Sequence, residues 1–251
     1  MSARLDQELT TRELARSRTV AARWIAEGRV LVNGEPATKA SVRVGADDRL
    51  EIRPADGPDY VSRAGHKLAG ALTAFPDITV AGKRCLDAGA STGGFTDVLL
   101  RAGAREVVAV DVGHDQLVPA LRQDDRVRVF EGTNVRWMRP EDIGGPAQLT
   151  VCDLSFISLT LVVGPLAAAT VPGGDLVLMV KPQFEVGADR LARTGVVTSE
   201  QERARAVDAV AAAARAHGLT VRGQERSPLP GQDGNHEFFL WCRRDVESAT
   251  P

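Results

Sequence analysis

The chain has 251 residues, 43% of them hydrophobic and 25% charged, which is typical of a globular protein with a well-formed core. Its formal net charge is −2, so no overall basic field attracts nucleic acid, and any such binding must come from local patches. The longest apolar run, residues 159–171, contains Gly164 and Pro165 and is too short and too broken to span a bilayer.

The cysteines and the first residues indicate in which cellular compartment the protein is expected. Cys85, Cys152 and Cys242 are odd in number, far apart and without metal-ligand spacing, so we expect buried free thiols in a reducing compartment. The opening sequence Met-Ser-Ala-Arg-Leu-Asp carries early charge and no apolar core, unlike a secretion signal. These features predict a cytoplasmic protein without a membrane segment or a metal site.

Residues 1–53 are predicted to form a small α+β unit. Leu5, Leu9 and Leu14, and then residues 20–25, have helical spacing, and Ser17 is a suitable N-cap for the second helix. Strand residues then flank the dipeptide Asn33-Gly34, which is a strong hairpin signal. Residues 54–59 contain two prolines, a glycine and two acids and are predicted to be a linker.

This first unit carries a local cluster of arginines. Guanidinium forks suit phosphate oxygens, although a solvated charged face is the ordinary alternative. Helices and a hairpin that precede a larger α/β region favour recognition of RNA by shape. The candidate RNA-binding residues are Arg4, Arg12, Arg16, Arg18, Arg23 and Arg29, together with Arg63 just beyond the linker.

From Tyr60 the pattern becomes an alternation of strands and helices. Ser62 can cap a helix that carries Arg63, His66 and Lys67. Strands are expected over 84–88, 106–110, 127–130, 149–153, 175–181, 219–226 and 236–243, and helices over 93–102, 114–122, 158–169 and 199–217. This alternation predicts a largely parallel, doubly wound sheet. The loop after residue 226 leaves no room for a crossover helix, so the last strand is expected to be antiparallel.

The segment Asp87-Ala-Gly-Ala-Ser-Thr-Gly-Gly-Phe-Thr is a glycine-rich turn between a buried strand and a helix. The next strand ends at Asp111, where a carboxylate can bind a ribose diol. The glycine order of the dinucleotide fingerprint is absent, and the turn has no basic residue to meet a phosphate. S-adenosylmethionine is a phosphate-free nucleoside ligand that fits these features, whereas an ordinary strand-to-helix turn is the alternative.

Unusual polar residues follow several of the expected strands. Asp153 and Lys181 end two parallel strands, and an antiparallel last strand brings Glu237 to the same edge. Lys67, on the helix before the first strand, could reach this edge too. A lysine at a crowded edge can lose its charge through desolvation or a second cation and then act as a general base. We therefore expect Lys181 to be the base, Asp153 to hold it, Lys67 to be the second cation and Glu237 to complete the network. The alternative is that these are solvated loop residues.

The ordered set Lys67, Asp153, Lys181 and Glu237 around this turn resembles the Lys-Asp-Lys-Glu tetrad of FtsJ-like ribose 2′-O-methyltransferases, and more closely the TlyA family, whose members are named rRNA methyltransferases or haemolysins. The supporting segments are SRAGHKL (62–68), LDAGASTGGFTD (86–97), VAVDVG (108–113), TN (133–134), DLSFISL (153–159), VKPQFEVG (180–187), GVV (195–197) and GNHEFFL (234–240). Residues 4–52 resemble the alpha-L RNA-binding domain of ribosomal small-subunit protein four.

The resemblance implies a Rossmann-like class I methyltransferase domain over residues 60–245, with a tail over 246–251. It implies methylation of ribose 2′-hydroxyls, of cytidine, in ribosomal RNA or ribosomal subunits, with S-adenosylmethionine as cofactor and no metal. The target nucleotide is expected to be flipped out of its stack. The implied cofactor-binding residues are Asp87, Gly89, Ala90, Ser91, Gly93, Gly94, Phe95, Thr96, Asp111, Val112, Asn134 and Asp153.

The chain departs from the family pattern at two places. His114 stands where a tyrosine is usual, near the adenosine contacts, and residues 192–194 replace a stretch rich in glycine and lysine in an expected RNA-facing loop. Three other functions fit parts of the sequence. A small-molecule or nucleoside O-methyltransferase is the main alternative, a non-catalytic RNA-binding protein leaves the tetrad unexplained, and a pore-forming haemolysin follows only from the family name.

Overall fold

The computed structural model describes residues 2–15, 17–54, 57–187, 195–231 and 233–246. The chain divides into two compact units, Met1–Asp59 and Tyr60–Pro251. The division falls at the end of the segment expected to be a linker. Each unit has its own set of buried apolar side chains.

The first unit is a small α+β domain. Its helices are α1 (Leu5–Thr11) and α2 (Arg18–Ala26), and its strands are β1 (Ala3–Arg4), β2 (Val30–Val32), β3 (Glu35–Pro36), β4 (Arg43–Val44) and β5 (Leu50–Ile52). Among the described residues, β1 pairs with β4, and β2 lies between β3 and β5. Leu5, Leu9 and Ile25 are almost completely buried in its core.

Two local predictions for this unit are confirmed and one is wrong. The Ser17 side chain accepts a hydrogen bond from Val20 N at 3.2 Å and so caps α2. Asn33 and Gly34 join β2 to β3 with φ angles of 54° and 88°, as a two-residue hairpin turn requires. Leu14, in contrast, lies beyond the end of α1 and is 38% exposed, because the helix stops before Glu13, whose φ is 57°.

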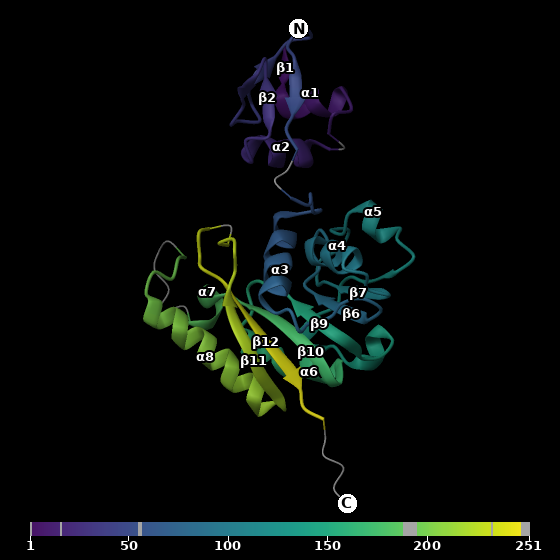
Figure 1. The fold of residues 1–251 in the computed structure, drawn as a ribbon, viewed down its shortest axis with the longest axis vertical. Coiled ribbons are helices and arrows are strands. Elements are labelled where there is room, and N and C mark those ends of the chain that lie inside the picture. The colour runs from purple at the N-terminus through teal and green to yellow at the C-terminus, as the bar shows by residue number, and fades with distance from the viewer. Residues whose placement is uncertain (1, 16, 55–56, 188–194, 232, 247–251) are drawn as a thin grey trace, which may run out of the picture. The chain divides into compact units, whose positions relative to one another are not determined.

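Among the described residues of the second unit, seven strands form one sheet in the order β11-β12-β10-β9-β6-β7-β8 (Figure 1). The strands are β6 (Arg84–Ala88), β7 (Glu106–Val110), β8 (Val127–Phe130), β9 (Ala147–Cys152), β10 (Thr170–Val180), β11 (Leu219–Arg226) and β12 (Phe238–Arg244). Strands β6 to β10 pair in parallel, and β12 is antiparallel to both of its neighbours. The expectation of a parallel sheet with an antiparallel last strand is confirmed.

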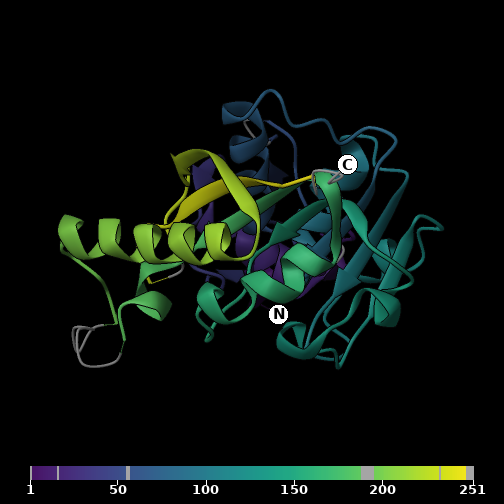
Figure 2. The ribbon, with the colours of Figure 1, turned by 90° about the horizontal axis from the view of Figure 1, so that it is seen from below.

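Helices cover both faces of this sheet. They are α3 (Arg63–Ala74), α4 (Gly94–Arg101), α5 (Pro119–Arg122), α6 (Val163–Ala168), α7 (Pro182–Glu185) and α8 (Glu200–Ala216), with 3₁₀ turns η1 (Val135–Trp137), η2 (Pro140–Ile143) and η3 (Leu159–Leu161). Alternate residues along a strand face opposite sides of the sheet. In β6, Leu86 packs with residues of α6 and α8 on one side, and Cys85 packs with residues of α3 and α4 on the other. Figure 2 shows α8 running along β11.

Three predicted boundaries are wrong, each for a local reason. The helix expected over 114–122 begins only at Pro119, because proline suits the first turn of a helix and not its interior. The helix expected over 158–169 is split into η3 and α6. Strand β10 begins at Thr170 and not at residue 175, with a register shift before Asp175 that includes Gly173 at φ 76°.

Candidate active site

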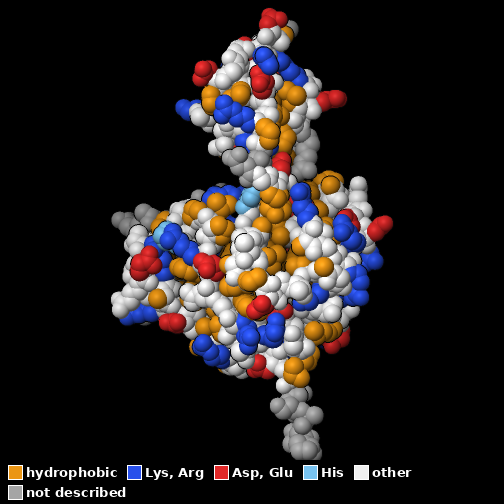
Figure 3. All heavy atoms as spheres, viewed as in Figure 1, with side chains coloured by type: hydrophobic (Ala, Val, Ile, Leu, Met, Phe, Trp, Pro, Cys, Tyr) orange, Lys and Arg blue, Asp and Glu red, His pale blue; other side chains and the backbone are white. Residues whose placement is uncertain are grey.

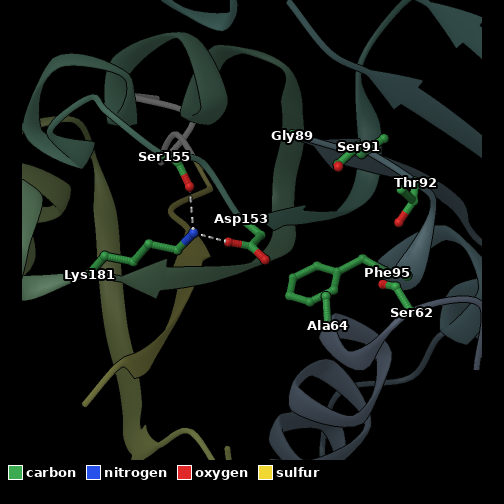
Figure 4. A pocket seen from close by; sticks show the side chains of 11 residues that line it. Ser62, Ala64, Gly89, Ser91, Thr92, Phe95, Asp153, Ser155 and Lys181 are labelled. Atoms are coloured by element: carbon green, nitrogen blue, oxygen red, sulfur yellow. Dashed lines mark hydrogen bonds and ion pairs between the residues drawn. The ribbon is translucent and has the colours of Figure 1, made fainter. Parts of the chain in front are cut away.

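Two adjoining pockets lie at the carboxyl ends of the parallel strands of the second unit. The larger, of about 510 Å³, is lined by residues that follow β7, β8 and β9, and the smaller is about 170 Å³. Both are lined by Gly89, Ser91, Asp153 and Ser155, so they meet between the turn after β6 and the end of β9. Figure 4 shows the smaller pocket, with Lys181 and Asp153 on one side and Phe95, Ala64 and Ser62 on the other.

The turn after β6 packs directly against the end of β9, and this contact requires glycine. Gly89 has a φ of 90°, and a Cβ atom on it would lie 2.4 Å from the carbonyl oxygen of Asp153. The glycine therefore provides both the left-handed backbone and the close approach that bring this turn to Asp153. Gly93 serves the other end of the turn, where a Cβ atom would lie 2.3 Å from Leu121 Cδ1.

The Asp111 carboxylate is fixed at the end of β7 by two backbone amides. Ser91 N donates to Oδ2 at 2.8 Å and Gly113 N donates to Oδ1 at 2.7 Å. Asp111 lines the larger pocket together with Val112, which is 67% exposed, and Asn134. Since each carboxylate oxygen has further acceptor capacity, Asp111 can still accept hydrogen bonds from two ligand hydroxyls.

Three of the expected cofactor residues, Asp87, Gly93 and Thr96, line neither of the two pockets in the described structure, and Asp87 and Thr96 are fully buried beneath the turn. Thr96 Oγ1 donates to Asp87 Oδ2 at 2.6 Å, while Oδ1 has no hydrogen-bond partner among the described residues. Burial raises the pKa of Asp87 to about 7, and the nearby carboxylate of Asp153 adds to this effect. The geometry assigns this pair to the support of the turn.

The four tetrad residues form two separate ion pairs. Lys181 Nζ lies 2.6 Å from Asp153 Oδ1, and Lys67 Nζ lies 2.6 Å from Glu237 Oε2. Lys181 follows β10 and its side chain points into the smaller pocket, where dashed lines in Figure 4 join its amine to Asp153 and Ser155. The four residues thus lie in two contacting pairs, a division that the sequence did not predict.

The Lys67–Glu237 pair differs from the other in its surroundings. Lys67 is 8% and Glu237 3% exposed, and in the described structure neither lines a pocket. The pair joins α3 to the segment before β12, so the charge of Lys67 is balanced by Glu237. The expected role of Lys67 as a second cation beside Lys181 is therefore not supported by a contact, and the pair instead braces the helix that supplies Ser62 and Ala64 to the smaller pocket.

Several pocket residues were not predicted as site residues. Ser155 Oγ accepts a hydrogen bond from Lys181 Nζ at 2.9 Å, and Phe156, 91% exposed with a φ of 63°, lines the larger pocket and contacts the Phe184 ring at 5.3 Å between centroids. Their position in the loop just after Asp153, beyond Leu154, is a signal that could have identified both. Gln116 and Thr133 also line the larger pocket, whereas His114 lies with its ring against Gly132.

The predicted arginine cluster is mostly engaged within the first unit. Arg12 donates to the carbonyl oxygens of Gly45 and Asp48 and pairs with Glu8, while Arg23 and Arg29 pair with Asp59. These three arginines hold loops and the end of the unit. On the viewed face of each unit, acidic and basic side chains are interspersed (Figure 3).

Arg4 and Arg18 are better placed to meet a ligand. Both pair with the buried carboxylate of Asp6, at 2.9 Å each, and keep 41% and 59% of their side chains exposed. The hydrogen bond from Arg4, together with Arg18, lowers the pKa of Asp6 to about 2. In the second unit Arg63 donates to Pro230 O at 3.2 Å. Arg16 and residues 192–194 lie outside the described residues.

The other sequence expectations concern cysteines, metals and membranes. Cys85, Cys152 and Cys242 are buried free thiols, as predicted. The described part of the chain holds no cluster of three or more His, Cys, Asp or Glu side chains that could bind a metal ion. Of its helices, none is both long enough and apolar enough to cross a membrane.

Comparison with known proteins gives both units a family. Residues 60–244 match the FtsJ-like methyltransferase model, and residues 3–50 match the S4 domain model. A protein of Mycobacterium tuberculosis named 16S/23S rRNA (cytidine-2′-O)-methyltransferase TlyA is 51% identical over 247 residues, which cover 98% of this chain and 92% of that protein.

Two further relatives show the same relationship. A Bacillus subtilis protein named as a candidate rRNA methyltransferase, YqxC, is 41% identical over 94% of this chain and 84% of its own length. A solved structure of a candidate hemolysin from Streptococcus thermophilus is 39% identical, with a TM-score of 0.77 over 97% of this chain and 89% of that one.

The fold and the family match define the second unit as a methyltransferase of the FtsJ-like class, carried on the same chain as an S4 domain. With half of its residues identical over nearly its whole length to a TlyA protein, the chain belongs to the TlyA family of these enzymes.

Proposed function

We propose that the protein transfers a methyl group from S-adenosylmethionine to the 2′-hydroxyl of a cytidine ribose in ribosomal RNA. The observation that carries this proposal is the Lys181–Asp153 pair at the junction of two adjoining pockets, one of which also holds the amide-bound Asp111. The names of the TlyA relatives support the substrate. The match of residues 3–50 to an S4 domain favours RNA over a free nucleoside.

The residues present fit the cofactor. Asp111 would accept hydrogen bonds from the ribose hydroxyls and Val112 would pack against the base in the larger pocket, which has room for a nucleoside. The turn around Gly89 and Ser91 and the smaller pocket would hold the amino-acid part. When bound, the cofactor supplies an electrophilic methyl group on a sulfonium, which leaves readily without a metal. The carboxylate of Asp153 suits a cationic ligand at this junction.

In the proposed reaction Lys181 acts as the general base. Its neutral amine accepts the proton of the 2′-hydroxyl while the oxygen forms its bond to the methyl carbon and the carbon–sulfur bond breaks. Asp153 orients the amine through the 2.6 Å contact, and the protonated Lys181 then releases its proton to solvent. Lys67 and Glu237 keep α3 in place against the last strand.

RNA binding is assigned to the S4 unit and to the rim of the site. Arg4 and Arg18 both pair with Asp6, whose negative charge offsets the repulsion between them. Their exposed guanidinium groups suit phosphate oxygens. In the second unit Arg63, which lies on α3 between the pocket-lining residues Ser62 and Ala64, would supply a separate phosphate contact. The substrate and the three free thiols support a cytoplasmic location.

Two measurements test this function. Ribose methylation is mapped in ribosomal RNA from cells with and without the protein, and one or more 2′-O-methylcytidines should disappear without it. The purified protein is then given an RNA in which the 2′-hydroxyl of the target cytidine is replaced by hydrogen. Methylation of this RNA at the target nucleotide would show that the acceptor is a base atom and would refute the proposal.

A further inference from the structure

Lys181 Nζ has two oxygen contacts in the structure, an ion pair with Asp153 of the tetrad and a hydrogen bond to Ser155, which is outside the tetrad. Its Nζ lies 2.6 Å from Asp153 Oδ1 and 2.9 Å from Ser155 Oγ, on different sides of the nitrogen in Figure 4. Ser155 also lines both pockets, so its hydroxyl lies where the pockets meet. A side chain at this junction is close to the place where a methyl group would be transferred.

The hydrogen bond to Ser155 bears on the chemistry of a neutral amine. A neutral lysine nitrogen carries two hydrogens and one lone pair, in a tetrahedral arrangement with its carbon. When Ser155 accepts one hydrogen and the Asp153 carboxylate confines the nitrogen through the ion pair, the lone pair is held to fewer directions. An amine without the Ser155 hydrogen bond would rotate more freely about its carbon–nitrogen bond and spread the lone pair over more directions, which lowers the fraction of productive encounters.

The loop that carries Ser155 is anchored on both sides. Asp153 N donates to Ala88 O at 3.0 Å, which ties the beginning of the loop to the end of β6. At its other end, Ser158 Oγ and Leu159 N donate to the carboxylate of Glu185, at 2.5 and 2.8 Å. Glu185 lies on α7, which begins directly after Lys181, so Ser155 and Lys181 are held in one framework.

We propose that Ser155 is a positioning residue that sets the direction of the Lys181 lone pair and so makes the neutral amine an efficient base. This inference rests on the proposed function, because it assigns Ser155 a role through Lys181. It adds to the four-residue tetrad a fifth side chain, contributed by the loop after β9.

The test compares Ser155→Ala, Ser155→Thr and Lys181→Ala with the wild-type protein in single-turnover methyl transfer to unmodified ribosomal RNA. Ser155 is exposed, so its replacement leaves the core intact. Loss of one hydrogen bond should slow transfer by Ser155→Ala about 3- to 10-fold, with the affinities for RNA and cofactor changed less than about twofold. Ser155→Thr keeps the hydroxyl and should restore most of the rate. Thr73→Ala, an exposed hydroxyl on α3 that bonds only Ala69 O in the described structure, is the control.

The pH profile separates positioning from a purely structural role. An acceptor stabilises the ammonium form of an amine more than the neutral form, so removal of the Ser155 hydroxyl should move the rise of the rate with pH to lower pH. If Ser155→Ala has the rate and pH profile of wild type while Lys181→Ala is inactive, the role of Ser155 is refuted and the proposed function stands. An equal loss in Ser155→Ala and Ser155→Thr would also refute that role. An active Lys181→Ala would instead refute the proposed function.

Discussion

Lys67 on α3 and Glu237 before β12 form a buried ion pair of 2.6 Å across 170 positions of the chain. Such a pair contributes little net free energy relative to apolar residues, but removing one partner leaves an uncompensated buried charge. Its position therefore ties a helix at the start of the domain to the strand that ends it. Because α3 supplies Ser62 and Ala64 to the smaller pocket, the pair acts on the site through the fold.

Glu237→Gln should lower the free energy of unfolding by about 3 kcal/mol, or roughly 6–12 °C in Tm. The double variant Lys67→Met, Glu237→Leu removes both charges and should recover part of this loss. Thermal unfolding followed by circular dichroism measures both. A single variant as stable as wild type would show that the pair does not brace the domain, and activity lost without any loss of stability would return Glu237 to the catalytic machinery.

Lys181→Ala should reduce the rate of methyl transfer about 10²- to 10⁴-fold while leaving cofactor affinity nearly unchanged, because the base is removed and the nucleoside pocket is not. The wild-type rate should also rise with pH, since only the neutral amine has a lone pair. Single-turnover assays over a range of pH and calorimetric titration of the cofactor provide the two readouts. Near-wild-type turnover by the variant would remove Lys181 from the mechanism.

Asp111→Ala should weaken cofactor binding about 10- to 100-fold, the value of a lost hydrogen bond to a charged group, and slow the reaction much less at saturating cofactor. Asp111→Asn is the matched variant, since it keeps one acceptor oxygen and should fall between the two. Calorimetry measures the affinities. Unchanged affinity in Asp111→Ala would place the ribose elsewhere.

Asp87→Asn should change how stability depends on pH. Burial raises the pKa of Asp87 from 3.8 to about 7, so the folded state binds more protons than the unfolded chain between these values. Stability contributed by the protonated form is therefore present below about pH 4 and is lost as pH rises through about 7. Between pH 5 and pH 7 the loss is about 2 kcal/mol.

Asparagine resembles the protonated carboxyl and does not titrate. The difference in free energy of unfolding between Asp87→Asn and wild type should therefore grow in favour of the variant across this pH range. Urea unfolding at several pH values tests it. A difference that is constant with pH would mean that Asp87 ionises in the folded state as it does in the unfolded chain.

The regular part of the fold could be predicted from the sequence because buried parallel strands are continuous apolar runs. Residues 84–88 and 106–110 are strands with the predicted bounds, and the antiparallel last strand followed from the short loop before it. Ends that depend on tertiary packing could not be predicted. Strand β10 extends back to Thr170 because this residue pairs with Ala147 of β9, on the far side of the register shift before Asp175. No local sequence pattern encodes that partner.

The tetrad was predicted as four residues at one edge, and its division into two pairs was not. Strand order places Lys181 beside Asp153, since β10 pairs with β9. The sequence could not show that Glu237 would neutralise Lys67, because that depends on how α3 packs against the segment before β12. The partner of Lys181 in the next loop, Ser155, is a common residue whose role depends on geometry alone.

The contact between Gly89 and the Asp153 carbonyl oxygen has a consequence for attempts to redesign this enzyme. A methyl group at position 89 would clash with the backbone of Asp153, the residue that pairs with Lys181. A substitution intended to alter cofactor binding would therefore also displace the group that orients the proposed base. Val112 and Asn134, which line the larger pocket after β7 and β8, are the places to accommodate a bulkier cofactor analogue. Alkyl donors with an enlarged adenine should therefore be matched by changes at these two residues, with residue 89 left as glycine.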